Sequence, residues 1–295
     1  MMLSQLSLGL TSPAVPTRAS APTMAFKTDT PRPDLQSGLD FTWDKPWGDS
    51  KEISDKAGLQ ALAKKLNPIL GYWDPMNIGE TSKENIAWFR HAEIKHGRVA
   101  MAAFVGFTVQ AAGLHFPWGL TGTVSYADIS AAGGPGDQWD ALPSASKMQI
   151  LLFIGFLELW SESHEALALD GQKHYVRGGK PGHFPSMKNA LPHPIPFDLF
   201  DPFGLSKNAT PEQKEQGLLK EINNGRAAML GMFGYVSASK GLIVPGLDSL
   251  PLKPYAGEFM APFSAINADL PFVQAMLDLR TEQIAREATF LNQVW

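Results

Sequence analysis

Two short stretches of the chain combine a carboxylate, an arginine and a side chain able to coordinate a metal ion. The first is EIKHGRVAM, residues 93–101, and the second is EINNGRAAM, residues 221–229. His96 in the first corresponds to Asn224 in the second. Imidazole nitrogen, amide oxygen and carboxylate oxygen can each serve as one axial ligand to Mg²⁺ already held by a tetrapyrrole. A free Mg²⁺ or Ca²⁺ site would need several converging carboxylates, which neither stretch supplies.

The charged residues of each stretch are spaced so that they cannot pair locally. Glu93 and Arg98 are five residues apart, which puts them about 140° apart around a helix and outside the i,i+4 geometry of a helical ion pair. Glu221 and Arg226 have the same spacing. If the two helices cross about a twofold axis, Glu93 meets Arg226 and Glu221 meets Arg98. The spacing therefore predicts two reciprocal ion pairs between helices.

Small residues lie between the charges that we expect to pair. Gly97 and Gly225 occupy equivalent positions, and Ala100 and Ala228 follow one turn later. Small side chains at such positions let two helices approach closely. The sequence therefore places the predicted crossing point at the two glycines.

Three segments have the character of long helices: residues 84–113, 144–165 and 211–239. They lack interior proline, and Pro143-Ser144 and Thr210-Pro211 are suitable helix starts. None contains the roughly 18 uninterrupted apolar residues of a simple membrane span. Taken alone, they could equally be buried helices of a soluble protein.

The distribution of basic residues favours membrane spans. Residues 112–143 contain no Lys or Arg, whereas residues 170–220 contain seven, and more precede the first segment. Such alternation is typical of spans oriented by their loop charges. We therefore predict an all-α protein with three transmembrane helices, the first and third crossed about a pseudo-twofold axis, plus short amphipathic helices. Lys95, which corresponds to Asn223, is expected to face the membrane surface.

The remaining composition excludes several classes of site. The net charge is −4, which gives no general affinity for nucleic acid. The absence of cysteine excludes disulfides, thiolate metal sites and iron–sulfur clusters. Phosphate-binding glycine loops, the dinucleotide glycine fingerprint and the His-Glu-x-x-His motif are all missing. A non-enzymatic role is therefore favoured, with a tetrapyrrole-related membrane enzyme as the alternative of another class.

The chain divides into four regions by composition. Residues 1–28 lack Asp and Glu and are rich in Ser, Thr, Ala and Pro, which is typical of a plastid transit leader, although a disordered tail would look similar. An N-terminal segment, 29–70, precedes the three-helix domain at 71–241. The C-terminal tail, 242–295, contains an amphipathic pattern at 270–291 that could lie on a membrane, a partner or the protein's own surface.

The two repeated stretches together resemble the light-harvesting chlorophyll-binding proteins of photosynthetic eukaryotes. HYVRGGKPGHFP (174–185) and GFLELWSE (155–162) are similar to the red-lineage chlorophyll a/c branch. The resemblance implies an antenna subunit that binds chlorophyll a, chlorophyll c and carotenoids such as fucoxanthin, peridinin or diadinoxanthin. Its implied partners are a photosystem I or II core, other antenna subunits and thylakoid lipids. The implied location is the plastid thylakoid membrane, with a stromal N-terminus and a lumenal C-terminus.

The resemblance also implies roles for particular residues. Arg98 and Arg226 match the structural ion-pair partners. The two Asp-Pro segments resemble those that hold carotenoid ends, although turn formation alone would also explain them; they comprise Trp73, Asp74, Pro75, Phe200, Asp201 and Pro202. The matches to axial ligands of chlorophyll magnesium are Glu93, His96, Gln149, Glu158, Glu221 and Asn224.

Some positions depart from the green-plant pattern or have competing interpretations. Ala238 stands where that pattern has a Gln ligand. The His ligand that the pattern has in a short C-terminal helix has no counterpart, because no His follows His193. Gln149 could simply be a polar residue near a helix start. Three further histidines near helix ends could bind extra pigments, but we expect them to face solvent: His115, His164 and His174. A photoprotective member that dissipates excitation is the alternative to an antenna with the same fold.

Overall fold

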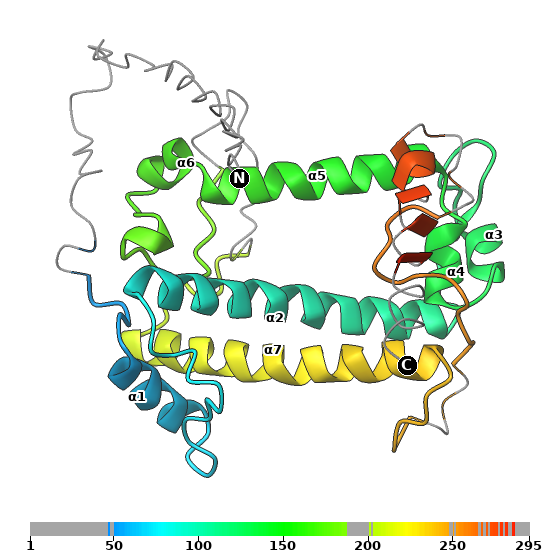
Figure 1. Cartoon of the computed structure of the whole chain (residues 1–295). Helices are drawn as coiled ribbons and strands as arrows, with labels where there is room; N and C mark the ends of the chain where they lie inside the picture. The colour runs from blue at the N-terminus through cyan, green and yellow to red at the C-terminus, as the bar shows by residue number, and fades with distance from the viewer. Residues whose placement is uncertain are drawn as a thin grey trace, which may run out of the picture. The chain divides into compact units, whose positions relative to one another are not determined.

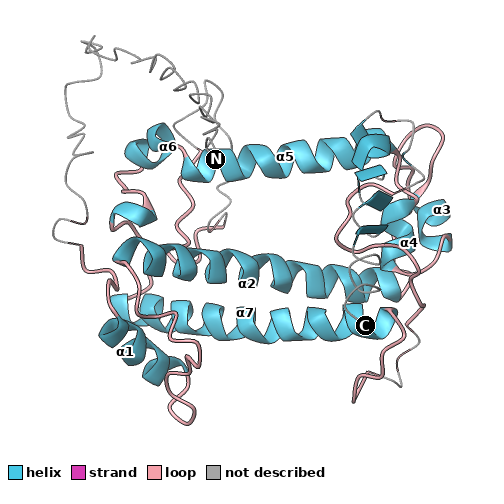
Figure 2. Cartoon of the chain, viewed as in Figure 1, coloured by secondary structure: helices cyan, strands magenta, loops and turns pink. Residues whose placement is uncertain are grey.

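The computed structural model describes residues 47, 50–187, 201, 203–247, 250, 252–264, 267, 270, 272–276, 278–279, 281–282 and 285–286. The predicted leader at 1–28 lies outside these residues. The described chain is helical and contains no strand, only an isolated bridge between Gly119 and Ser125 (Figure 2). The predicted all-α class is therefore confirmed for the described residues.

The three predicted long helices form close to their expected bounds. They are α2 (Lys83–Ala111), α5 (Ser144–Glu162) and α7 (Pro211–Ser239). The Ser82 side chain caps α2, and Thr210 and Gln213 form a reciprocal capping box at the start of α7. The second helix ends earlier than predicted because Ser163 caps a separate helix, α6 (His164–Leu169).

Helices α2 and α7 lie side by side along their length, and α5 runs beyond α2 (Figure 1). Within the described ranges, no helix has both the length and the apolar character required to cross a membrane. The three-span arrangement therefore stays a prediction.

Shorter elements that the sequence did not resolve surround the ends of the long helices. Helix α1 (Lys56–Leu66) packs Leu66 into a small core with Ile94 of α2 and Ile222 of α7. The Asn223 side chain donates a hydrogen bond to the Leu66 carbonyl at 3.1 Å. The other short elements are α3 (Tyr126–Ala131), α4 (Pro135–Asp140) and the 3₁₀ helix η1 (Tyr175–Arg177).

The C-terminal region packs against α4 and the start of α5. The Trp139 indole donates to the Pro262 carbonyl at 2.9 Å, and Tyr255 donates to Asp140 at 2.9 Å. Residues 272–276 are helical, as the amphipathic pattern predicts. Val273 is buried there, whereas Phe272 is about half exposed. Lys147 in the first turn of α5 donates to the Asp140 carbonyl at 3.1 Å and to Asn267 at 2.8 Å, which ties the start of α5 to α4 and to the C-terminal region.

Candidate functional site

The two reciprocal ion pairs form as the spacing predicts. Arg98 Nε donates to Glu221 Oε1 at 2.5 Å, and Arg226 Nε donates to Glu93 Oε1 at 2.6 Å. All four side chains are partly exposed, at 27–44% of their surface. Among the described residues, Oε2 of each carboxylate has no hydrogen bond or ion pair. Each glutamate is thus charge-compensated and keeps one oxygen available as a ligand.

The two glycines lie at the crossing point itself. A Cβ added to Gly97 would stand 3.0 Å from the Cα of Gly225, and one added to Gly225 would stand 2.8 Å from the Cα of Gly97. The obstacle in both cases is backbone, which cannot rotate away. Only glycine permits this approach, and the approach brings the two ion pairs within reach.

The His96 ring is held with one nitrogen facing outward. Its Nδ1 lies 2.8 Å from the Ala92 carbonyl oxygen, one turn earlier in α2. A carbonyl oxygen only accepts, so Nδ1 carries the proton and the Nε2 of the neutral ring has a free lone pair. The residue is exposed. Ring orientation and tautomer are therefore already those of a metal ligand.

Asn224 occupies the equivalent position on α7. It is exposed, and the described part of the chain makes no hydrogen bond to its amide. Its amide oxygen can therefore act as a ligand from the surface of α7. No three His, Asp or Glu side chains among the described residues are placed to hold a free metal ion. The single-ligand arrangement at His96 and Asn224 instead fits a metal whose other ligands come from a macrocycle.

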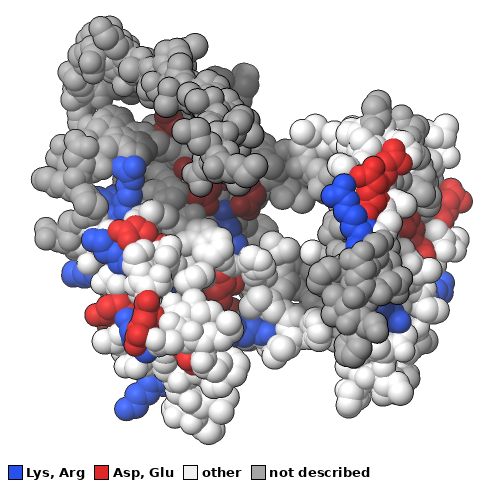
Figure 3. Space-filling view, viewed as in Figure 1, with Lys and Arg blue, Asp and Glu red and all other residues white. Residues whose placement is uncertain are grey.

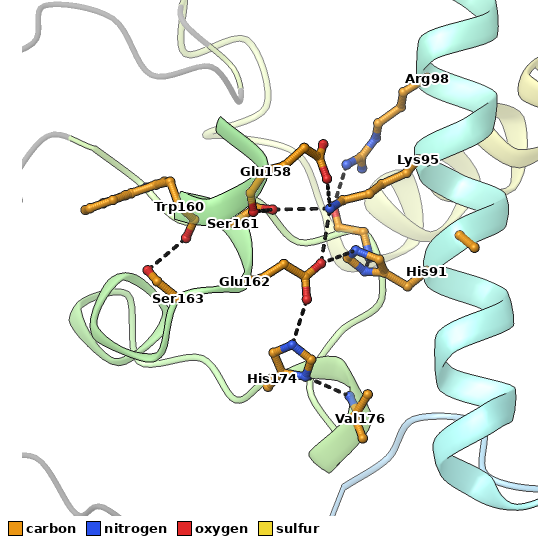
Figure 4. A network of polar contacts seen from close by, with 12 residues as sticks. His91, Lys95, Arg98, Glu158, Trp160, Ser161, Glu162, Ser163, His174 and Val176 are labelled. Atoms are coloured by element: carbon orange, nitrogen blue, oxygen red, sulfur yellow. Dashed lines mark hydrogen bonds and ion pairs between the residues drawn. The ribbon is translucent and has the colours of Figure 1, made fainter. Parts of the chain in front are cut away.

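Lys95 was expected at the membrane surface, and this prediction is wrong. Its ammonium group contacts Glu158 at 2.6 Å, Ser161 at 3.2 Å and Glu162 at 3.1 Å, all at the end of α5 (Figure 4). Only 25% of the Lys95 side chain is exposed. Lys95 therefore links α2 to α5 and compensates the Glu158 charge, as the two arginines do for Glu93 and Glu221.

A histidine pair extends this contact to the loop after α6. His91 is 4% exposed, accepts a hydrogen bond from the Gly182 amide at Nδ1, and stacks on Tyr175 with 3.9 Å between ring centroids. His174 contacts Glu162 through Nε2 at 2.8 Å (Figure 4). His174 was expected to face solvent, and that is wrong because Glu162 binds its ring. Burial and the Glu162 carboxylate raise the pKa of Tyr175 to about 12.

The remaining candidate ligands of α5 both lie on its surface. Gln149 and Glu158 are exposed, and their spacing of nine residues places them on opposite faces of the helix. Glu158 has one oxygen on Lys95. Their assignment as ligands stays a prediction.

The carboxylates of the two Asp-Pro segments form the same turn. Asp74 accepts from the amides of Ile78 and Gly79 at 2.9 and 2.8 Å, and Asp201 accepts from those of Leu205 and Ser206 at 2.6 and 2.8 Å. In both segments the Asp carboxylate accepts from the amides four and five residues later, so the internal repeat includes these turns.

The other residues of the Asp-Pro segments are less constrained. Trp73 is 82% exposed and Pro75 is exposed. Phe200 and Pro202 lie outside the described residues. A carotenoid role for either segment stays a prediction.

The two turns predict a pH response. Backbone hydrogen bonds from Gly79 and Ile78 lower the pKa of Asp74, and hydrogen bonds from Ser206 and Leu205 lower the pKa of Asp201. A carboxyl group whose pKa is lower in the folded state stabilises the fold fully above its ordinary pKa, about 3.9. This stabilisation is lost as the pH falls through the lower pKa of the folded state. Both turns should therefore persist down to pH 4, as carboxyl carbon chemical shifts can follow.

The control for this prediction is Ser206→Ala. The Ser206 hydroxyl donates to Asp201 Oδ2 at 2.5 Å, so its removal should raise the Asp201 midpoint and leave that of Asp74 unchanged. Wild-type midpoints at or above the ordinary value would contradict the prediction.

Comparison with known proteins decides the family. A sequence profile described as "Chlorophyll A-B binding protein" matches residues 59–240, which is more than half of the 295 residues. The chain belongs to the chlorophyll A-B binding protein family. The matched range contains both repeated stretches and all three long helices.

Three proteins similar to this chain are described as fucoxanthin-chlorophyll a-c binding proteins. The fucoxanthin-chlorophyll a-c binding protein of Trieres chinensis is 35% identical over 178 residues, which cover 57% of this chain and 72% of the relative. Protein A of that description from Phaeodactylum tricornutum is 38% identical over 167 residues, covering 55% and 71%. Protein A from Macrocystis pyrifera is 29% identical over 204 residues, covering 68% and 80%.

Sequence reasoning missed the contact between α2 and α5 in this chlorophyll A-B binding chain. The signal was available. His91 and Lys95 are four residues apart, as are Glu158 and Glu162, so each pair lies on one face of its helix. A lysine on one helix face and two glutamates on the face of a neighbouring helix predict a contact between them.

Proposed function

We propose that this chlorophyll A-B binding chain is a light-harvesting antenna subunit that holds chlorophyll a, chlorophyll c and a fucoxanthin-type carotenoid. The family match and the names of its relatives support this assignment. Bound chlorophyll would supply light absorption and the excited state. The task of the protein is then to fix the positions, orientations and surroundings of the pigments so that excitation passes to a photosystem.

The observation that carries the proposal is the outward lone pair of His96 beside the paired charges. The Ala92 carbonyl fixes the ring, and the crossed pair fixes the helix that carries it. Glu93, Glu221 and Glu158 each combine a cation on one oxygen with a remaining lone pair. A compensated carboxylate can ligate Mg²⁺ without placing net charge in an apolar environment. These residues fit magnesium tetrapyrroles.

Large apolar side chains support placement of the long helices in a thylakoid membrane. Many are exposed between the helix ends, although water would disfavour such exposure: Val99 and Val105 of α2, Leu152, Phe153, Ile154 and Leu159 of α5, and Leu230 and Phe233 of α7. On the visible face, charged side chains gather toward the two ends of the long helices, with mainly uncharged surface between them (Figure 3).

Paired charges make three spans compatible with the composition of the helices. The mean hydropathy of a helix treats each charged residue as unpaired. The arginines and glutamates of α2 and α7 instead neutralise each other. Basic residues before α2 and between α5 and α7 would then place the N-terminus on the stromal side and the C-terminus in the lumen.

The test is pigment counting after reconstitution of the full chain with a pigment extract. His96→Leu is expected to lose one chlorophyll per chain, because Leu cannot ligate Mg²⁺. His96→Asn is the matched control, since Asn is the residue that the repeat carries at position 224, and it should retain that chlorophyll. An unchanged count in both His96→Leu and Asn224→Leu would refute these ligands.

A further inference from the structure

A cavity of about 480 Å³ lies at the end of α2 that is remote from the Lys95 contact. The last turns of α2, the following loop, α3, α4 and the start of α5 line it, and it opens to the surface. Its volume is within the range of small-molecule sites, about 300–1,000 Å³. The residues assigned to chlorophyll ligation above do not line it.

The wall of this cavity is apolar and aromatic, with one imidazole. Phe116, Tyr126 and Trp139 line it, and so does His115. Phe116 stacks on Trp118 with 4.7 Å between ring centroids and meets the Tyr126 ring edge-on at 5.5 Å. Aromatic walls of this kind suit a flat, largely apolar ligand.

The His115 ring is held in the same way as that of His96. Its Nδ1 lies 3.0 Å from the Phe116 carbonyl oxygen. Because a carbonyl oxygen only accepts, Nδ1 carries the proton and Nε2 has a free lone pair. The residue is exposed. Its imidazole is thus available for coordination from the wall of an apolar cavity.

Other histidines use their rings for contacts within the protein. His174 and His183 each bind a carboxylate through Nε2, at 2.8 and 2.6 Å. The Nε2 of His91 lies 3.3 Å from Glu162. In His96 and His115 the proton is on Nδ1 and Nε2 is free. In the other three rings Nε2 instead lies beside a carboxylate.

The cavity wall is held in place before any ligand binds. Gln138 is 8% exposed and donates both to the Gln110 carbonyl and to the Gly133 carbonyl, each at 3.1 Å. The Trp139 indole nitrogen is occupied by Pro262, which leaves its ring as an apolar surface. Helix α4 is therefore tied both to α2 and to the C-terminal region.

We propose that this cavity binds an additional magnesium tetrapyrrole whose axial ligand is His115 Nε2. The site deepens the proposed function, since it assumes a chain that binds chlorophyll. A purely hydrocarbon ligand would make no use of the imidazole lone pair, whereas Mg²⁺ in a macrocycle takes one axial donor. The apolar ring face would then lie against the aromatic wall.

The first test replaces the ligand in the full chain, reconstituted with chlorophylls and carotenoids and analysed by chromatography and low-temperature absorption. His115→Leu is expected to lose one chlorophyll per chain with its red absorption component, and His115→Asn is expected to keep it. A full chlorophyll count in His115→Leu would overturn the proposal, as would loss of a carotenoid alone.

The second test fills the cavity and leaves His115 in place. Gly106 lines the cavity, and a Cβ there meets nothing within 4 Å, so Gly106→Leu should fold and lose the same chlorophyll. Gly217→Leu is the matched control, because Gly217 also has open space at its Cβ and is not among the lining residues. If His115→Leu fails to fold, the chlorophyll counts of Gly106→Leu and Gly217→Leu decide whether the cavity binds a chlorophyll.

His96→Leu separates this proposal from the proposed function. Loss of one chlorophyll in His96→Leu together with a full count in His115→Leu and Gly106→Leu would refute only the additional site. A full count in all three would refute both the additional site and the ligand role of His96.

Discussion

A Gly97→Leu chain is expected to lose the crossed pair of α2 and α7. The first side-chain atom would lie 3.0 Å from the Gly225 Cα, and three more carbon atoms would follow it into the space occupied by backbone. Overpacking a core usually costs about 1–3 kcal/mol when neighbouring side chains can move. Here the neighbour is a helix backbone, so we expect a cost above that range and failure of pigment reconstitution.

The comparison for this variant is Gly155→Leu in α5. A Cβ at Gly155 meets nothing within 4 Å, and the same exchange gains up to about 1 kcal/mol of helix propensity. Thermal unfolding followed by circular dichroism should show a large loss for Gly97→Leu and none for Gly155→Leu. Equal melting temperatures for the two variants would show that the crossing does not depend on glycine.

The two arginines should differ in their effect, although the sequence repeat makes them equivalent. Arg98 donates both to Glu221 and to the Gly182 carbonyl, whereas within the described part of the chain Arg226 donates to Glu93 alone. Hydrogen bonds to charged groups contribute about 1.5–3 kcal/mol each. These side chains are partly exposed, so the low end applies. Arg98→Leu should therefore destabilise by about 3 kcal/mol, roughly twice the effect of Arg226→Leu.

Denaturant unfolding of the reconstituted proteins measures both effects. Adding Glu221→Gln to Arg98→Leu should recover part of the loss, because it removes a carboxylate left without its cation. The Gly182 contact is not restored, so the recovery should stay incomplete. Equal losses for the two arginine variants, or full recovery in the double variant, would contradict the asymmetry.

The sequence was most informative where its two halves repeat each other. The spacing of Glu93 and Arg98 excluded a local ion pair, and only a partner helix could satisfy both charges. The third helix was predicted at its observed bounds, Pro211–Ser239, because both its capping residues and the end of its repeated motif are visible. The crossing point followed from Gly97 and Gly225.

Several features that occur in one half alone were not predicted. Lys95 was set aside because its counterpart is Asn223, yet it forms the contact to α5. Helix α1 has only 11 residues and depends on packing against Ile94 and Ile222. The exposure of His115 was predicted, but the cavity beside it depends on where α3 and α4 place residues 126–142.

The crossed pair also constrains the order in which the chain can fold. Its ion pairs join residues 123 and 133 positions apart, and contacts so distant in sequence form late and slowly. During synthesis α2 emerges first, and its Glu93 and Arg98 have no partner until α7 has been made. A chain that stops before α7 would keep unpaired charges and an uncovered Gly97. The contact between α2 and α7 can therefore form only after α7 has been synthesised.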